Sequence, residues 1–257
     1  MRKRLLAYSK LKFVTLDHVD STNAEAKRLA KTGEKGPLWV RANHQTKGRG
    51  RRGREWVSKT GNLYCSGLYP HKGTLQEAAQ MSFVAALAVA ECLEGYIPKI
   101  KIKLKWPNDV LVDAKKTSGI LLEGGDGWFV VGIGINLTSH PQETDFPATH
   151  LLEHIDPVKL NVAEPIITGP DTVLASLAAR FDHWRHIALD KGFDPISEAW
   201  LSRAYNIPGR VTVNLHKEKF SGHALNLDEN GALRVRLENG TIRHVHAGDV
   251  FFRDGGA

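Results

Sequence analysis

A run of short apolar segments with only brief turns between them, over residues 100–137, is the feature that most constrains the fold. Residues 100–106 alternate strictly between apolar side chains and lysines, which predicts a strand with one buried face. The segments "DVLVD", "SGILLEG" and "WFVVGIGINL" follow closely. Turns of hairpin length join antiparallel strands, because parallel neighbours need a crossover of roughly a dozen residues. We therefore expect a mostly antiparallel sheet, in which one strand face consists of Ile100, Ile102, Leu104 and Trp106.

The N-terminal part of the chain adds strands and two helices. We predict the strands at 11–20, 37–43 and 62–69. The segment "STNAEAKRLAKTG" is typical of a helix, with a capping box from Thr22 to Glu25 and a stop at Gly33. Residues 74–94 predict a long helix that is apolar on most faces and therefore buried. Helices that cover a central sheet indicate an α+β fold.

The pattern of the sequence changes twice after residue 138. Residues 139–170 carry several prolines and no clear period, which indicates an irregular connection, and helices return at about 172–191 and 193–204. From Ile207 onward, short alternating segments are separated by turns rich in Asn and Gly, which is typical of a small β-barrel or roll. The pattern predicts two domains, 1–206 and 207–257.

Composition excludes some classes of protein and leaves others open. No window reaches the roughly 18 apolar residues of a membrane helix, and "MRKRLLAYSK" lacks the apolar core of a signal peptide. Cys65 and Cys92 each lie in an apolar run, so we expect core cysteines and a reducing, cytoplasmic location. The net charge of +7 fits a nucleic acid, a small polyanion or an acidic protein equally well.

The loop "TKGRGRRGREW" (46–56) packs four arginines and one lysine around three glycines. It satisfies G-x-G-x-x-G, but a strand follows where the dinucleotide fingerprint requires a helix, and it lacks the glycine of a phosphate-binding P-loop. Three interpretations stay open: a cradle for a polyanion, a nucleic-acid contact, or a solvated loop. Trp56 favours a ligand, because a solvated loop gains little from a large aromatic.

The segment "HLLEH" (150–154) matches the H-x-x-E-H signature of one class of zinc protease. It lies between prolines, and the sequence around it offers no obvious further ligand. We therefore expect a capped or exposed segment there and no metal site.

Small polar residues stand where several strands end. "DSTN" (20–23) opens a helix, "KWPND" (105–109) forms a turn, Lys115 and Lys116 precede a buried strand, and Asn136 closes "GIGIN". Each has a structural explanation by itself. In this order, together with the arginine–glycine loop, they closely resemble the biotin protein ligases over almost all of residues 14–137.

The resemblance implies a class II synthetase-like biotin/lipoate ligase catalytic domain, a mixed and mostly antiparallel sheet with helices. Residues 207–257 resemble the family's SH3-like C-terminal domain. The N-terminal winged-helix domain of the repressor-type members has no counterpart, so we expect no operator DNA as a partner.

The resemblance also implies the reaction. Biotin and ATP condense to biotinyl-5′-adenylate, and a lysine of a carrier domain then takes the biotin. Lys116 matches the catalytic lysine, Arg51 matches an arginine that holds the adenylate, and Asp109 matches a carboxylate that handles the incoming lysine. This chemistry brings negative charges together, so cations and backbone donors suit it.

The remaining positions follow from the same resemblance. The expected biotin-binding residues are Ser21, Thr22, Asn23, Gln45, Gly48, Arg49, Gly50, Arg51, Lys116 and Gly119. The expected ATP and adenylate residues are Arg49, Arg51, Trp56, Lys105, Asn108, Lys116 and Asn136.

The partners implied are biotin, ATP with Mg²⁺, and the biotin carboxyl-carrier domain of a carboxylase. We expect no protein cage for the metal, no membrane, and either a monomer or a homodimer. The arginine loop is predicted to be disordered without an anion and to close once the adenylate forms. Two alternatives remain: a lipoate–protein ligase of the same fold, and a basic module that binds nucleic acid.

Overall fold

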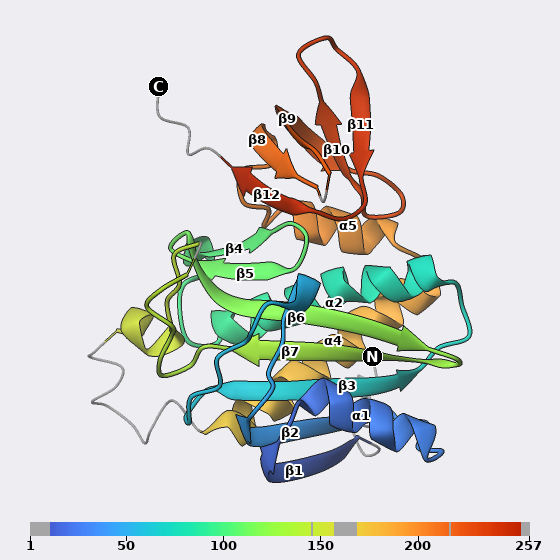
Figure 1. Cartoon of the computed structure of the whole chain (residues 1–257), viewed down its shortest axis with the longest axis vertical. Coiled ribbons are helices and arrows are strands. Elements are labelled where there is room, and N and C mark those ends of the chain that lie inside the picture. Colours follow the sequence, from blue (N-terminus) through green and yellow to red (C-terminus); the bar gives the residue numbers. More distant parts are fainter. Residues whose placement is uncertain (1–10, 145, 157–168, 216, 253–257) are drawn as a thin grey trace, which may run out of the picture.

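The computed structural model describes residues 11–144, 146–156, 169–215 and 217–252. Its centre is a seven-stranded sheet in the order β1-β2-β3-β7-β6-β5-β4 (Figure 1). The strands are β1 (Lys12–Val19), β2 (Leu38–Gln45), β3 (Leu63–Pro70), β4 (Ile102–Lys105), β5 (Asp109–Val112), β6 (Lys115–Gly125) and β7 (Trp128–Ile135). Every neighbouring pair is antiparallel except β1 and β2, which the helix between them allows to run parallel. The predicted mostly antiparallel sheet is confirmed.

Helices cover both faces of this sheet. The helices are α1 (Thr22–Lys31), α2 (Leu75–Glu94), α4 (Pro170–Lys191) and α5 (Asp194–Leu201), with short 3₁₀ turns η1 (Arg51–Gly53), η2 (Lys99–Lys101) and η3 (Leu151–His154). Trp39 of β2 lies in the large core with α2 and α4, whereas its neighbours Leu38 and Val40 pack with Ala26 of α1. Because side chains alternate along a strand, α1 lies on the face opposite α2 and α4. The functional candidates lie on the α1 face.

The start of α1 differs from the prediction. Ser21 is the N-cap residue, and no side chain caps the helix, so the capping box predicted from Thr22 to Glu25 is wrong. The Thr22 side chain is engaged with Gln45 instead. A capping box is present at the start of α2, where the Thr74 side chain accepts from the backbone N–H of Glu77.

Two further predictions fail at element boundaries. Ile100 is 78% exposed in η2, since β4 begins only at Ile102, so it does not share the buried face of that strand. Helix α5 ends at Leu201, before the expected residue 204. The segment after it pairs with Leu104, whose N–H donates to the Arg203 carbonyl at 2.8 Å. This long-range pairing gives the backbone an alternative to the last helical turn.

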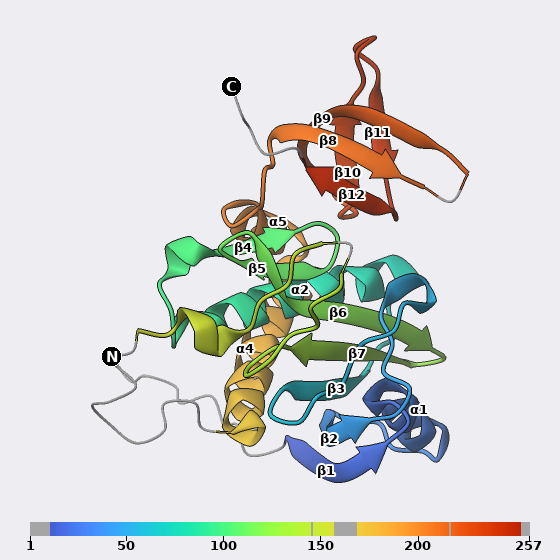
Figure 2. The same cartoon turned by 60° about the vertical axis from the view of Figure 1, so that its left-hand side comes forward.

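The C-terminal part is a five-stranded antiparallel sheet in the order β11-β10-β9-β8-β12, next to α5 (Figure 2). Its strands are β8 (Gly209–Asn214), β9 (Lys219–Leu227), β10 (Leu233–Arg236), β11 (Ile242–Val245) and β12 (Asp249–Phe252). The buried indole of Trp106 donates to the Gly231 carbonyl at 3.1 Å and ties this sheet to the larger one. The division of the chain at residue 206 stays a prediction.

The cysteines lie where the sequence places them. Cys65 and Cys92 are both buried with free thiols, and burial raises the pKa of each. Both are therefore core residues. Within the ranges given above, no helix is both long enough and apolar enough to cross a membrane.

Candidate active site

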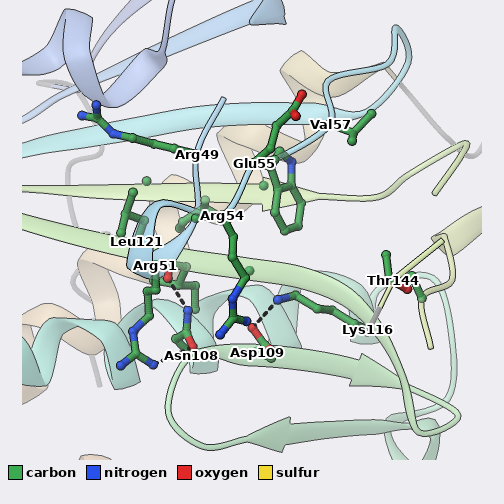
Figure 3. A pocket seen from close by; sticks show the side chains of 18 of the residues that line it. Arg49, Arg51, Arg54, Glu55, Val57, Asn108, Asp109, Lys116, Leu121 and Thr144 are labelled. Atoms are coloured by element: carbon green, nitrogen blue, oxygen red, sulfur yellow. Dashed lines mark hydrogen bonds and ion pairs between the residues drawn. The ribbon is translucent and has the colours of Figure 1, made fainter. Parts of the chain in front are cut away.

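A cavity of about 870 Å³ opens on the α1 face of the large sheet (Figure 3). Its walls come from the start of α1, the loop 46–57, strands β3 to β7, the connection after β7, and β12 of the C-terminal sheet. All the expected site residues line this cavity except Gly48. The Gly48 carbonyl accepts from the Trp56 N–H at 3.0 Å, so this residue closes the base of the loop and does not face the cavity.

Strand register explains why residues distant in sequence meet here. One row across the sheet runs Tyr64, Gly134, Gly119, Asp109 and Lys105, on β3, β7, β6, β5 and β4 in that order. Residues in one register row of a sheet point to the same face. The backbone pairing therefore carries the carboxylate of "PND" and the lysine of "KWP" into the same cavity.

Glycines in this row and the next make the floor. A side chain at Gly134 would collide with the Trp56 indole, one at Gly119 would come within 2.8 Å of the same ring, and one at Gly132 would meet the Asn23 amide. The absence of Cβ atoms thus lets Trp56 and Asn23 lie against the sheet backbone. The Trp56 indole nitrogen is buried without a hydrogen-bond partner among the described residues.

Neutral side chains occupy one end of the cavity, which we call the amide end: Thr22, Asn23 and Gln45 line it, and Ser66 bonds to Thr22 and Asn23 from outside the lining. The Thr22 N–H and hydroxyl both point at Gln45 Oε1, at 2.8 and 3.1 Å. The Ser66 hydroxyl is fully buried, donates to Asn23 Oδ1 at 2.6 Å and lies 2.8 Å from the Thr22 hydroxyl. These groups hold one another in place and present both donors and acceptors, which a neutral urea requires.

Glu123 of β6 anchors the outside of this end. Its carboxylate accepts from Asn23 Nδ2 at 2.9 Å, pairs with Lys27 at 2.6 Å and pairs with Arg49 at 3.2 Å. Burial raises the pKa of Glu123, but the hydrogen bonds from Lys27 and Asn23, together with the charges of Arg49 and Lys27, lower it overall. Arg49 consequently points away from Lys116 and Asp109 (Figure 3).

Cationic side chains line the other end, which we call the cation end (Arg51, Lys105 and Lys116). Lys116 Nζ lies 2.7 Å from Asp109 Oδ1, and the two side chains point toward one another in Figure 3. The same ammonium stands 5.7 Å from the centre of the Trp56 ring. The Lys116 backbone is fixed by the segment after β7, since its N–H donates to Pro147 and its carbonyl accepts from Thr149.

Lys105 is the least compensated of these cations. It is only 7% exposed, its ammonium lies 3.9 Å from the centre of the Phe146 ring, and no described carboxylate forms a direct ion pair with it. Burial lowers its pKa, against the more distant attraction of Asp109. A buried cation in this state is costly unless an anion joins it.

The arginines of the loop divide between the cavity and the C-terminal sheet. Arg51 donates to Asn108 Oδ1 at 3.2 Å, and burial lowers its pKa. Arg52 pairs with Asp249 of β12 at 3.0 Å, and Arg54 pairs with the other oxygen of the same carboxylate. Burial raises the pKa of Asp249, but the hydrogen bond and charge of Arg54 together with the charges of Arg52 and Arg51 lower it overall, and the carboxylate joins the loop to the second sheet.

Several residues in or directly beside the cavity were not predicted from the sequence. Ser66 and Glu123 hold the amide end, whereas Phe146, Arg54 and Asp249 border the cation end. A serine inside the apolar strand "NLYCSGLY" is a signal that could have identified Ser66. Asp249 carries no such signal, because its partners lie at the opposite end of the sequence.

Comparison with known proteins identifies relatives over both parts of the chain. A family model described as the biotin/lipoate A/B protein ligase family matches residues 16–138, and one described as the biotin protein ligase C terminal domain matches residues 210–253. The biotin–[acetyl-CoA-carboxylase] ligase of Paracoccus denitrificans is 38% identical over 245 residues, which cover 92% of this chain and 99% of the relative. The ligase of the same name from Mycobacterium tuberculosis is 34% identical over 90% of this chain and 85% of its own.

The fold is similar to that of a solved enzyme as well. The structure of biotin protein ligase from Aquifex aeolicus in complex with biotin and ATP superposes with a TM-score of 0.75 and 30% identity. The match covers 94% of this chain and 98% of that one. The match therefore extends over both the large sheet and the C-terminal sheet.

Proposed function

We propose a mechanism on the premise that the chain belongs to the biotin protein ligase family. The chain is a ligase of the type that uses ATP to activate biotin and then attaches the biotin to a protein. The observation that supports this most directly is the cavity itself. A neutral, hydrogen-bonding end and a cationic end meet within it at the Lys116–Asp109 pair.

The amide end suits the ureido ring of biotin. Thr22, Asn23 and Gln45 offer hydroxyl and amide groups, and Ser66 fixes their orientation. The carboxylate of biotin would then point along the sheet floor toward Lys116. Each polar group of the ring finds a partner that is already positioned, which reduces the entropy lost on binding.

In the first step, a carboxylate oxygen of biotin attacks the α-phosphorus of ATP, and the bond to the β-phosphate oxygen breaks to release pyrophosphate. Lys116 bridges the carboxylate and α-phosphate oxygens, while Arg51 and Lys105 face the other phosphate oxygens. Positive charge fixed where negative charge gathers stabilises this transition state. Lys116 must exchange Asp109 for the phosphoryl group to do so, which a flexible ammonium can do.

In the second step, the amine of an acceptor lysine attacks the carbonyl carbon of the adenylate, and the bond to AMP breaks. Asp109, released from Lys116, is placed to receive the proton that the amine loses. The acceptor we propose is a biotin carrier domain, since the Paracoccus relative is named after acetyl-CoA carboxylase. Asn108, Asn136 and Trp56 would border the nucleotide.

We propose that Mg²⁺ arrives with ATP and is held mainly by phosphate oxygens. Within the described part of the chain, the cavity lining holds no cluster of three His, Cys, Asp or Glu ligand atoms. A Mg²⁺ ion that accompanies a nucleotide commonly keeps several waters and takes few protein ligands. When bound, it would neutralise part of the charge on the phosphates.

A nucleic-acid role for the loop is disfavoured by where its arginines point. Arg49 pairs with Glu123, and Arg52 and Arg54 pair with Asp249, so these three do not form a free basic surface. A lipoate ligase of the same superfamily would differ from a biotin ligase in the substrate that it activates.

Biotin-dependent exchange of labelled pyrophosphate into ATP tests the proposal. We expect exchange with biotin, none with lipoate, and transfer of labelled biotin to a carrier domain. Exchange that depends on lipoate, or the absence of any exchange with biotin, would contradict it.

A further inference from the structure

Three side chains outside the cavity lining form a compact cluster beside it. His140 Nδ1 lies 2.8 Å from His150 Nδ1, and Glu153 Oε1 lies 3.4 Å from His150 Nδ1 and 3.9 Å from His140 Nδ1. His150 and Glu153 belong to the H-x-x-E-H segment, for which the sequence showed no third ligand. The fold supplies a further ligand, His140, from the connection that follows β7.

The separations match those of ligands around one metal ion. Tetrahedral ligands at roughly 2.0 Å from zinc lie roughly 3.3 Å from one another. The three observed distances lie on both sides of that value, and the three ligand atoms all lie within 4.8 Å of one another. Two imidazoles and a carboxylate, with the fourth position left to water, form a ligand set that zinc and its neighbours prefer over Mg²⁺.

The surroundings hold the carboxylate in place. The Thr149 hydroxyl donates to Glu153 Oε2 at 2.6 Å, which leaves Oε1 for the cluster. His154, the last residue of the segment, is engaged elsewhere, with Asp113 and Thr149 at 3.0 and 2.8 Å. Such hydrogen bonds to a ligand orient it before the metal arrives.

The cluster joins the two ends of a loop that borders the cavity. His140 precedes this loop and His150 follows it. The loop residues that line the cavity are Pro141, Gln142, Glu143, Thr144, Phe146 and Ala148. Its far end pairs with the backbone of Lys116. An ion at the cluster would therefore fasten both ends of this wall.

We propose that His140, His150 and Glu153 form a binding site for a divalent transition-metal ion of the zinc type, which clamps the loop between residues 140 and 150. The site is separate from any Mg²⁺ that accompanies ATP. Its test uses neither biotin nor ATP, so it can fail while the proposed ligase activity stands.

Calorimetric titration of the metal-stripped full chain with zinc tests the site. We expect one saturable site, lost in the double variant His140→Ala/His150→Ala with a fall in affinity of more than about 100-fold. His186→Ala is the matched control, because this histidine on α4 is exposed and its ring bonds to a carbonyl of its own helix, and it should leave zinc affinity unchanged. Equal zinc affinity in the double variant and the control would overturn the proposal.

Gentler substitutions keep the test valid if the double variant folds poorly. Glu153→Gln retains the shape of a half-exposed side chain and should lower the affinity for zinc at least tenfold. Thr149→Val removes the hydrogen bond to Glu153 and should lower the affinity for zinc by about 10–100-fold. Unchanged zinc affinity in both variants would exclude Glu153 as a ligand and overturn the three-ligand site.

The clamp has a readout of its own. Zinc should slow proteolytic cleavage within residues 141–148 of the unaltered protein and should not slow it in the double variant His140→Ala/His150→Ala. Cleavage that is equally fast with and without saturating zinc would show that the ion does not fasten the loop.

Discussion

The amide end and the cation end of the cavity are built on opposite principles. At the amide end, Thr22, Asn23, Gln45 and Ser66 satisfy one another's hydrogen bonds before any ligand binds. At the cation end, Lys105 is buried without a direct carboxylate partner among the described residues, and burial lowers the pKa values of both Lys105 and Arg51.

The difference shows how one cavity can treat two substrates differently. A satisfied network costs little in the folded state and selects a neutral ring by shape and hydrogen bonding. Buried cations cost stability until a polyanion arrives, and that cost would be recovered if ATP binds at this end, as we propose. The amide end should therefore contribute both stability and binding, whereas the cation end should contribute activity at the expense of stability.

The largest expected effect is at the junction of the two ends. Lys116→Ala removes the ammonium proposed to bridge biotin and the α-phosphate, so the rate of biotin-dependent pyrophosphate exchange should fall by about 100- to 1,000-fold. Lys115→Ala is the matched control, because the preceding lysine is exposed and should leave the rate unchanged. Equal rates in the two variants would remove Lys116 from the mechanism.

Lys105→Met should separate stability from activity at the cation end. The KM for ATP should rise by about 10- to 100-fold through loss of a charge-assisted contact, while Tm rises by about 2–4 °C because a buried cation is replaced by an apolar side chain. Steady-state kinetics and thermal denaturation measure the two effects. A lower Tm together with an unchanged KM would contradict the comparison.

The Tm difference between Lys105→Met and the unaltered protein should depend on pH. The folded-state pKa of Lys105 lies below its ordinary value of 10.5, so as pH rises the folded chain loses this proton at a lower pH than the unfolded chain does. Below the folded-state pKa, the buried ammonium lowers the unfolding free energy by its full amount. As pH rises from that pKa toward 10.5, the folded chain holds Lys105 neutral and this loss of stability becomes smaller. The Tm difference between Lys105→Met and the unaltered chain should therefore shrink over that range. A difference that is constant with pH would argue that charge burial is not its cause.

At the amide end, Ser66→Ala should lower the stability of the protein and also weaken the binding of biotin. The Asn23 carbonyl loses its donor inside a buried network, which costs about 1–3 kcal/mol of unfolding free energy. The KM for biotin should rise about tenfold with that for ATP unchanged. Ser82→Ala on α2, whose hydroxyl bonds only a helix carbonyl, is the control. A rise in the KM for ATP instead would show that the two ends are not independent.

The smallest effect should come from the link between the loop and the second sheet. Asp249→Asn breaks its ion pairs with Arg52 and Arg54, which are partly exposed, so the KM for ATP should rise about fivefold or less. Glu218→Gln breaks an exposed pair with Arg243 in the same sheet and should have no effect. A loss of activity as large as that of Lys116→Ala would assign Asp249 a direct role.

Local patterns determined the elements and the order of the site segments. Alternation and hairpin-length turns predicted the strands of the large sheet and its antiparallel character, because each depends on neighbouring residues alone. The resemblance carried by the arginine–glycine loop and "KWPND" predicted which residues line the cavity, and all but Gly48 do so. What these residues do there is still a prediction.

Boundaries failed where distant segments compete for the backbone or a side chain. The Thr22 side chain joins Gln45 and makes no capping box, and residues after Leu201 leave helix α5 to pair with Leu104. A capping or helical preference is worth about 1 kcal/mol, which a single long-range hydrogen bond can match.

Only the tertiary structure decided which polar groups meet. Register across β3 to β4 brings Asp109 and Lys105 onto one face, and chain folding brings Asp249 to the arginine loop and His140 to His150. Arg49 and Arg51 stand two residues apart, yet one pairs with Glu123 and the other enters the cavity beside Asn108.

The sequence by itself determined the residue types and the strand periods, because those depend on local sterics and hydrophobicity. The electrostatic partners depend on contacts between segments far apart in the chain, which no local pattern encodes.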